Sequence, residues 1–349
     1  MEQPDPHAQH PRAMRCGRRA VLAAAPAVLL PAAARGGAGQ PGAAGLVWPT
    51  RPVRIYAGSA AGGSLDATAR ILANALAPRL GQSFVVENRG GAGGSLTFEP
   101  VMRAAPDGHA LTLNNSGALV VNPLLQANPA VQPFEDLAPV ALASEVLTVL
   151  VTPADRPWQR LEDLVAAARA RPGELSWGHP GVGSSPWLAA LLLDRMAELR
   201  TISVPYRGGG PAMLDLLAGR LDYMFATTPT ALPHVQAGRL RALAVPTPQR
   251  LPFLASVPTV AELGYAGFEL RGWFGILTTK GTPRPIIERL HGAINEALRD
   301  PASVAQLAEQ GMSPLLAESP DAFARYAAEE RERWGPLARA AAAREAAAQ

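Results

Sequence analysis

Residues 56–66, YAGSAAGGSLD, decide the fold, because here an apolar run breaks into small residues and then restarts with helical spacing. The preceding run 53–57 predicts a β-strand. Apolar residues then follow at intervals of four, three, four and four, which predicts an amphipathic helix with Ser64 as its N-cap and Gly81 at its end. A loop of this kind leaves backbone N–H groups unpaired beside the positive end of a helix. It can therefore hold an anion without a cationic side chain.

The same combination of strand, glycine loop and helix recurs along the chain. Glycine loops at 58–64, 90–95, 181–185 and 208–211 each precede a predicted helix. Strands and helices alternate from 53 to 113, which predicts a parallel sheet with a ligand crevice at its carboxyl edge, and they alternate again from 146 to 245. A single glycine loop is weak evidence, since a tight turn needs the same residues. Four such loops favour a small anion, most naturally a carboxylate, held between two lobes.

The length and composition predict two globular domains. The chain has 349 residues, of which 48% are hydrophobic. We expect a discontinuous domain 1 of residues 48–147 and 271–349 and a domain 2 of residues 148–270. The segments near 146–151 and 268–276 then cross between the domains and form a two-strand hinge that lets the lobes close. Helices predicted at 284–299, 303–309 and 321–334 are assigned to domain 1, with a fraying tail.

The N-terminus has the layout of an export signal. Four arginines precede the apolar residues 20–34, and small residues suitable for cleavage follow, so residues 1–34 are predicted to be a signal peptide and 35–47 a flexible leader. The pair Arg18-Arg19 resembles a twin-arginine signal, with Sec export as the alternative, and Met14 is an alternative start to Met1. The only cysteine, Cys16, lies upstream of the apolar segment, which argues against lipid anchoring. A periplasmic location is expected.

Several functional classes are disfavoured. The net charge is +3, aromatic residues make up 5%, and the arginines are scattered, which does not suit nucleic-acid binding. Neither GxGxxG after the first strand nor GxxxxGK[ST] is present, so nucleotide binding is not expected. The histidines occupy unrelated contexts, without HExxH or GxSxG; His179, beside a glycine loop, is the partial exception. We therefore expect no metal, no cofactor and no catalytic residues. An exported enzyme acting on a small carboxylic acid on the same scaffold is the alternative.

Sequence motifs along almost the whole predicted mature chain resemble those of one family, the tripartite tricarboxylate transporter receptors of the TctC or Bug type. The matching residues, in chain order, are Trp48-Pro49, Arg51-Pro52-Val53-Arg54, Gly62-Gly63 with Asp66, Val85-Val86-Glu87-Asn88-Arg89, Gly91-Ala92-Gly93-Gly94, Ala104-Ala105-Pro106-Asp107-Gly108, Asn122-Pro123, Gly181 and Gly183-Ser184, Val204-Pro205-Tyr206-Arg207-Gly208-Gly209, Ala231-Leu232-Pro233-His234, Gly238-Arg239-Leu240-Arg241-Ala242-Leu243-Ala244-Val245, Val257-Pro258-Thr259-Val260-Ala261-Glu262, Trp273-Phe274-Gly275 and Gly281-Thr282-Pro283.

The resemblance implies an α/β, two-lobed type II periplasmic-binding-protein fold that closes like a flytrap over a small carboxylated metabolite. It implies a monomeric receptor that delivers its ligand to the membrane subunits of a transporter or to a sensor. Family members hold the carboxylate with backbone amides and ordered waters of the matching loops. The ligand-binding residues expected here are Ala60, Ala61, Gly62, Gly63, Ser64, Asp66, Ser116, Gly117, Ala118, Gly181, Val182, Gly183, Ser184, Ser185, Tyr206, Gly208, Gly209, Ala226 and Thr227.

Three departures from the family pattern bear on the ligand. Ala60-Ala61 replaces a common Pro-Pro, Trp187 replaces a common histidine, and Ala226-Thr227 replaces the Asp-Asn of several amino-acid binders. Without that acidic residue, a dicarboxylate, an aromatic carboxylate or a similar acid is favoured over an amino acid. Asp66 itself has two interpretations: it can stabilise the helix dipole, or it can accept a hydrogen bond from the ligand.

Overall fold

A computed structural model describes residues 47–126, 129–206 and 208–347. The predicted signal peptide, Cys16 and most of the leader lie outside these residues. Residues 45–349 form one compact unit. No helix of the described residues is long and apolar enough to cross a membrane.

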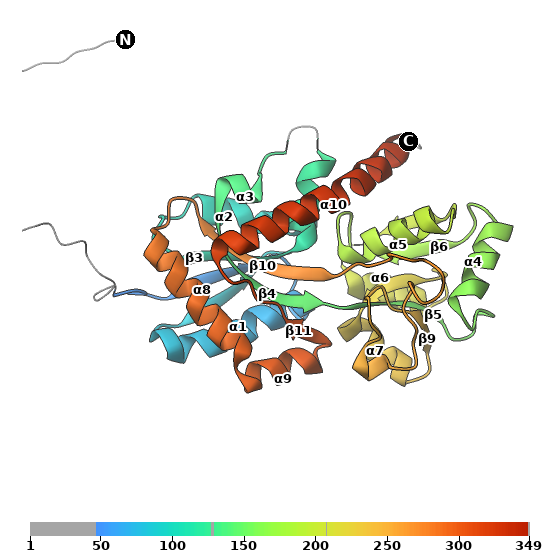
Figure 1. The fold of residues 1–349 in the computed structure, drawn as a ribbon, viewed down its shortest axis with the longest axis horizontal. Helices are drawn as coiled ribbons and strands as arrows, with labels where there is room; N and C mark the ends of the chain where they lie inside the picture. Colours follow the sequence, from blue (N-terminus) through green and yellow to red (C-terminus); the bar gives the residue numbers. More distant parts are fainter. Residues whose placement is uncertain (1–46, 127–128, 207, 348–349) are drawn as a thin grey trace, which may run out of the picture. The chain divides into compact units, whose positions relative to one another are not determined.

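The larger of the sheets has six strands in the order β11-β4-β10-β3-β1-β2 (Figure 1). The strands β1 (Val53–Ala57), β2 (Phe84–Asn88) and β3 (Ala110–Asn115) run parallel, as the sequence predicts. The strands β4 (Leu137–Val146), β10 (Gly272–Thr279) and β11 (Met312–Pro314) extend the sheet in antiparallel pairs.

Helices cover both faces of this sheet because successive strand residues point to opposite sides. In β1, Ile55 packs in the same cluster as residues of α1 (Ser64–Leu80), α8 (Arg284–Arg299) and α9 (Pro301–Glu309). Its neighbour Tyr56 packs with the short helices α2 (Phe98–Met102) and α3 (Pro133–Asp136) and with α10 (Pro320–Ala347). The sheet is therefore the middle layer of three.

The remaining strands all come from residues 148–244. The strands β5 (Thr148–Pro153), β8 (Met224–Thr227) and β9 (Leu240–Ala244) form a sheet in the order β8-β5-β9, and β6 (Ser176–His179) pairs in parallel with β7 (Ile202–Pro205). A bridge between Trp177 and Tyr223 links the two sheets. The helices α4 (Leu161–Ala170) and α5 (Ser185–Met196) contribute to one core, and α6 (Gly209–Leu217) and α7 (Thr228–Gln236) to another. The α/β, two-lobed prediction is confirmed.

Three segments connect the lobes. The β4–β5 junction at Leu147 and the start of β10 at Gly272 correspond to the predicted hinge. The third segment is α10, which continues to Ala347 where a fraying tail was expected. Its first half places Phe323 against the large sheet, while Trp334 packs in the core of α4 and α5. The proposed domain boundaries therefore stay predictions, with α10 contacting both lobes.

One local prediction was wrong: Ser64 is the first residue of α1, and Gly63 occupies the N-cap position without a side-chain cap. The helix predicted to follow the second glycine loop is the short α2, and a 3-10 turn (η1, Ala92–Thr97) precedes it. Gly93 and Gly94 take φ values of 64° and 101°, which interrupt α-helical geometry.

Candidate functional site

The carboxyl ends of β1, β2 and β3 bring the first two glycine loops together around Asn114. The buried amide of Asn114 donates to the Gly94 carbonyl at 2.9 Å and to the Thr97 hydroxyl at 2.8 Å. A Cβ on Gly58 would lie only 2.7 Å from the Asn114 Cγ, so the first loop also packs against this side chain. Asn114 therefore fixes both loops relative to the sheet.

Asp66 organises the loop that precedes α1. Its Oδ2 accepts the Gly62 N–H at 2.9 Å, and its Oδ1 accepts the Asn88 amide at 2.9 Å and pairs with the Arg70 Nε at 3.1 Å. Burial acts to raise the pKa of Asp66, but these hydrogen bonds outweigh it and lower the pKa below its ordinary value. Both oxygens thus have protein partners, and the side chain is 6% exposed. This favours the positioning interpretation of Asp66 over direct contact with a ligand.

The rest of the first loop remains accessible. Ala60, Ala61 and Gly62 are exposed, and Gly63 and Ser64 are half-buried. The first N–H groups of α1 have no intrahelical acceptor. The loop and the helix end therefore present backbone donors to solvent at the carboxyl edge of the sheet.

The loop that follows β3 enters a single π-turn, η2 (Gly117–Val121). Asn115 Oδ1 accepts the Ala118 N–H at 2.9 Å and so fixes the start of this turn. Ser116, Gly117 and Ala118 are all buried. A Cβ on Gly117 would lie 2.8 Å from the carbonyl carbon of Gly183, which places the second lobe's loop directly against this turn.

The loop at 181–185 is held by its own hydrogen bonds. Ser184 Oγ donates to the Gly181 carbonyl at 2.6 Å and accepts the Trp187 N–H at 3.4 Å, so Ser184 caps the start of α5. His179 Nδ1 accepts the Gly181 N–H at 3.2 Å. Burial lowers the pKa of His179 from 6.5 to about 4, so the ring is neutral at pH 7 and its Nε2 carries the proton that Ser203 accepts at 3.1 Å. His179 is only 1% exposed, so it stabilises the loop from the protein interior and does not face solvent.

The other predicted residues of the second lobe are more dispersed. Val182 is 37% exposed, and the Tyr206 hydroxyl donates to Asp215 at 2.8 Å. Ala226 is buried in β8, and the Thr227 hydroxyl bonds that of Thr230 at 3.0 Å. A Cβ on Gly208 or Gly209 would meet nothing within 4 Å. Within the described residues, no hydrogen bond joins Tyr206, Gly208, Gly209, Ala226 or Thr227 to the loops of the large sheet.

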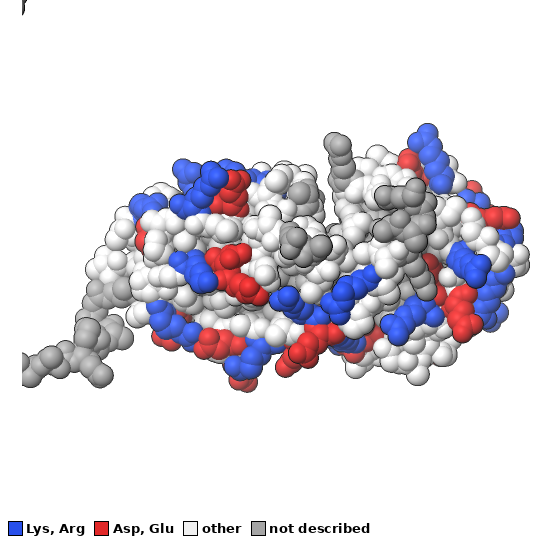
Figure 2. All heavy atoms as spheres, turned by 90° about the horizontal axis from the view of Figure 1, so that it is seen from above, with Lys and Arg blue, Asp and Glu red and all other residues white. Residues whose placement is uncertain are grey.

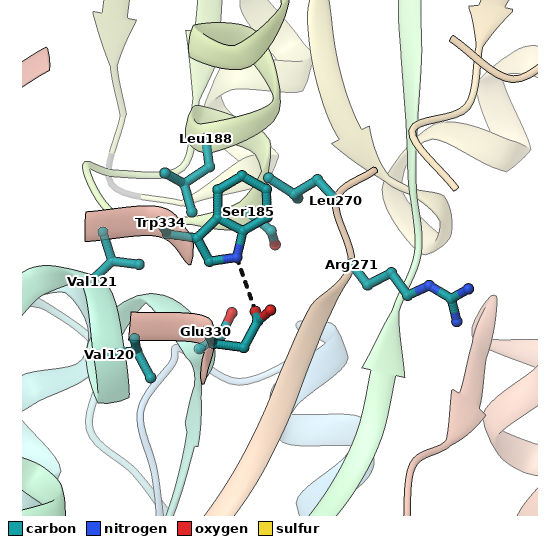
Figure 3. Close-up of a pocket in the computed structure, with 9 residues that line it drawn as sticks. Val120, Val121, Ser185, Leu188, Leu270, Arg271, Glu330 and Trp334 are labelled. Atoms are coloured by element: carbon teal, nitrogen blue, oxygen red, sulfur yellow. Dashed lines mark hydrogen bonds between the residues drawn. The ribbon is translucent and has the colours of Figure 1, made fainter. Parts of the chain in front are cut away.

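Ser116 and Ser185, predicted site residues from different lobes, line one small cavity at the lobe junction (Figure 3). Its volume of about 10 Å³ is close to the smallest space that holds one water molecule. Glu330 of α10 also lines it and accepts indole N–H groups from Trp334 at 3.0 Å and Trp273 at 3.2 Å. Burial raises the pKa of Glu330. Glu330 could not be predicted as a buried residue, because it lies in a charged stretch typical of a solvated helix.

The described residues contain no group of three His, Cys, Asp or Glu side chains placed to hold a metal ion. On the face in Figure 2, basic and acidic side chains are interspersed. Backbone donors and small residues thus lie together at the edge of the large sheet, next to the junction of two lobes, and form the candidate binding site. The fold and site define a two-lobed solute-binding protein.

The chain belongs to the family of tripartite tricarboxylate transporter receptors, whose family description matches residues 68–342. This confirms the resemblance of the sequence motifs, and the chain is a solute-binding receptor of this family. It is 39% identical to protein BugT of Bordetella pertussis over 297 residues, which cover 84% of this chain and 90% of BugT.

Solved structures agree. A structure from R. palustris with adipate has a TM-score of 0.79 and 33% identity, covering 83% of this chain and 97% of the other. MatC from Rhodopseudomonas palustris, with bound malate, has a TM-score of 0.76 and 32% identity, covering 83% and 100%. The periplasmic binding protein BugD has a TM-score of 0.76 and 32% identity, covering 83% and 97%.

Proposed function

We propose that this chain is a periplasmic receptor that captures a small dicarboxylate between its two lobes. The observation that carries the proposal is the loop at 60–63: Asp66 accepts the Gly62 N–H and so fixes the loop, and the end of α1 beside it presents N–H groups that have no intrahelical acceptor. Adipate and malate, bound by similar proteins, are both dicarboxylates. Ala226-Thr227 offers no acidic partner for an ammonium group, which supports an acid over an amino acid.

The capture step follows from the arrangement of donors. One carboxylate of the ligand is held by backbone N–H groups of the loops that follow β1 and β3, at the positive end of α1. The loop at 181–185 approaches from the second lobe and covers the bound acid. Hinge movement at Leu147 and Gly272 closes the lobes, and α10 adjusts where it contacts both.

A ligand screen tests this function. Adipate, malate, benzoate and aspartate are each added to the purified protein, and the thermal midpoint and the binding heat are measured. We expect a dicarboxylate to raise the midpoint and to be recovered unchanged, with aspartate weaker. Conversion of the acid would support the alternative of an exported enzyme. A screen in which none of the four acids binds would refute the proposal.

The biological setting is part of the same proposal. The receptor acts after export as a monomer and hands its ligand to membrane subunits of a tripartite tricarboxylate transporter or to a sensor. Light scattering of the periplasmic fraction checks the monomer, and co-purification with the membrane subunits from the same cell checks the partner. Recovery of the protein only from the cytoplasm would contradict this assignment.

A further inference from the structure

The side chain of Asn122 lies between glycine loops of both lobes. A Cβ on Gly93, in the loop after β2, would overlap the Asn122 amide nitrogen and lie 3.6 Å from its Cγ. A Cβ on Gly183, in the loop before α5, would overlap the Asn122 carboxamide oxygen and lie 2.9 Å from the same Cγ. The carboxamide thus occupies space that a side chain on either glycine would need.

The surroundings hold Asn122 in place. The Asn122 N–H bonds the Gly117 carbonyl and so closes the π-turn η2, and Pro123 restricts the backbone directly after it. Gly183 has a φ of +83° and packs on Gly117 as well as on Asn122. The second lobe's loop therefore contacts a rigid corner of the first lobe at two points.

The carboxamide makes no hydrogen bond with any other residue in the part of the chain that the structure describes. Its role in this structure is therefore steric, and its polar groups stay available at the meeting point of the predicted ligand loops. A residue that only stabilised the turn would not need to reach the opposite lobe.

We propose that Asn122 is a positioning residue for ligand capture: it sets how closely the loop at 181–185 approaches the loops at 90–95 and 116–118. This inference rests on the proposed function and adds a residue to it. The Asn122 carboxamide already occupies the gap left by the missing side chain of Gly183 in this structure. The distance between the lobes at the ligand is then fixed by this fit.

A double-mutant cycle tests the proposal with Asn122→Ala, Gly183→Ala and the double variant. Asn122→Ala is expected to weaken adipate or malate binding about tenfold, as truncation of a packed contact residue does. Gly183→Ala also weakens binding, because its methyl group overlaps the carboxamide. In the double variant this overlap is absent, so the loss is about tenfold smaller than the product of the single effects.

The control is Gly219→Ala, which has a left-handed φ of +72° and no neighbour within 4 Å of the added methyl group. This variant has only the strain of an alanine at a left-handed φ, without any steric overlap, and should leave ligand binding unchanged. Should Asn122→Ala not fold, Asn122→Ser removes the same contacts and retains a polar group. Unfolding free energies of the ligand-free variants are measured in parallel and should show the same non-additivity.

The outcomes separate the two proposals. If the wild type binds neither acid, the proposed function fails. If the wild type binds but Asn122→Ala binds equally well, the positioning role is wrong while the receptor function stands. Strictly additive effects of the two substitutions, on both affinity and stability, would show that Asn122 and Gly183 do not meet and would overturn the inference.

Discussion

We expect the Asp66 carboxylate to couple the stability of the first loop to ligand affinity, and Asp66→Asn tests this coupling. The three groups facing the carboxylate are the Gly62 N–H, the Asn88 amide and the Arg70 guanidinium, all of them donors. An asparagine keeps the shape but replaces one acceptor oxygen with an NH₂ group. One donor then loses its charged acceptor, and a hydrogen bond to a charged group contributes roughly 1.5–3 kcal/mol to the unfolding free energy.

The same substitution should weaken ligand binding. If the lost acceptor is the one that orients Gly62, the loop must be ordered again when the carboxylate binds, and we expect a dissociation constant about tenfold higher, or about 1.4 kcal/mol. Urea denaturation measures the stability, and titration calorimetry with the dicarboxylate identified in the screen measures the affinity. Asp163→Asn is the matched control, because this carboxylate accepts the Gln159 and Arg160 N–H groups at the start of α4, away from the site. It should lose stability, as for a lost helix cap, without loss of affinity.

The pH dependence gives a second measurement. The pKa of Asp66 is lowered in the folded protein, so its stabilisation is present above the unfolded pKa and is lost as the pH falls through the folded pKa. Below that pH, wild type and Asp66→Asn should be equally stable. The reasoning is refuted if Asp66→Asn matches the wild type in both stability and affinity at pH 7. A loss of stability with unchanged affinity would reduce Asp66 to a structural residue.

Three further predictions concern the lobe junction and the loops. The wild type should lose stability as the pH rises through the folded pKa of Glu330, because that pKa is raised and the buried carboxyl then ionises. Glu330→Gln should not show this loss, since its amide oxygen still accepts both indole N–H groups and does not ionise. Identical pH profiles of the two proteins in denaturation would contradict this. As the pH falls from 6.5, the unfolded pKa of His179, to its folded pKa of about 4, the protein should lose stability, because the buried ring must stay neutral. The loss should appear as faster amide exchange in the loop at 181–185. Exchange that is constant over this range would refute the role of neutral His179 in supporting the loop. Gly63→Val should abolish binding while the fold persists, since a Cβ there meets only the Ala60 carbonyl oxygen at 3.8 Å, and unaltered affinity would remove this loop from the site.

Elements with strong local signals could be predicted from the sequence. The bounds of α8 match the predicted helix at 284–299. Its apolar residues recur with helical spacing, and Thr282-Pro283 directly precedes it. The parallel order of the first three strands followed from the short crossovers between them. These features depend on residues that are close together in the chain, and they can therefore be predicted from a single sequence.

The conformation of the second glycine loop, residues 90–95, could not be predicted from the sequence. Its composition suggested a helix N-terminus, but Gly93 and Gly94 instead let the chain turn against Asn114. The loop therefore contributes shape, and α2, with five residues, begins only at Phe98. Whether glycines lead into a helix or permit close contact depends on a side chain from another strand, and the local sequence does not contain that information.

The C-terminal residues stay helical to Ala347, where the sequence predicted a fraying tail. Its alanines, arginines and glutamates favour a helix, but a helix rich in charge gives no sign of what it packs against. Trp334 inserts into the core of α4 and α5, and its indole N–H bonds Glu330 in the same helix. Because the first half of α10 packs on the large sheet, any rotation of the lobes must move or bend this helix. The helix α10 is therefore a third contact between the lobes, beside the two segments of the predicted hinge.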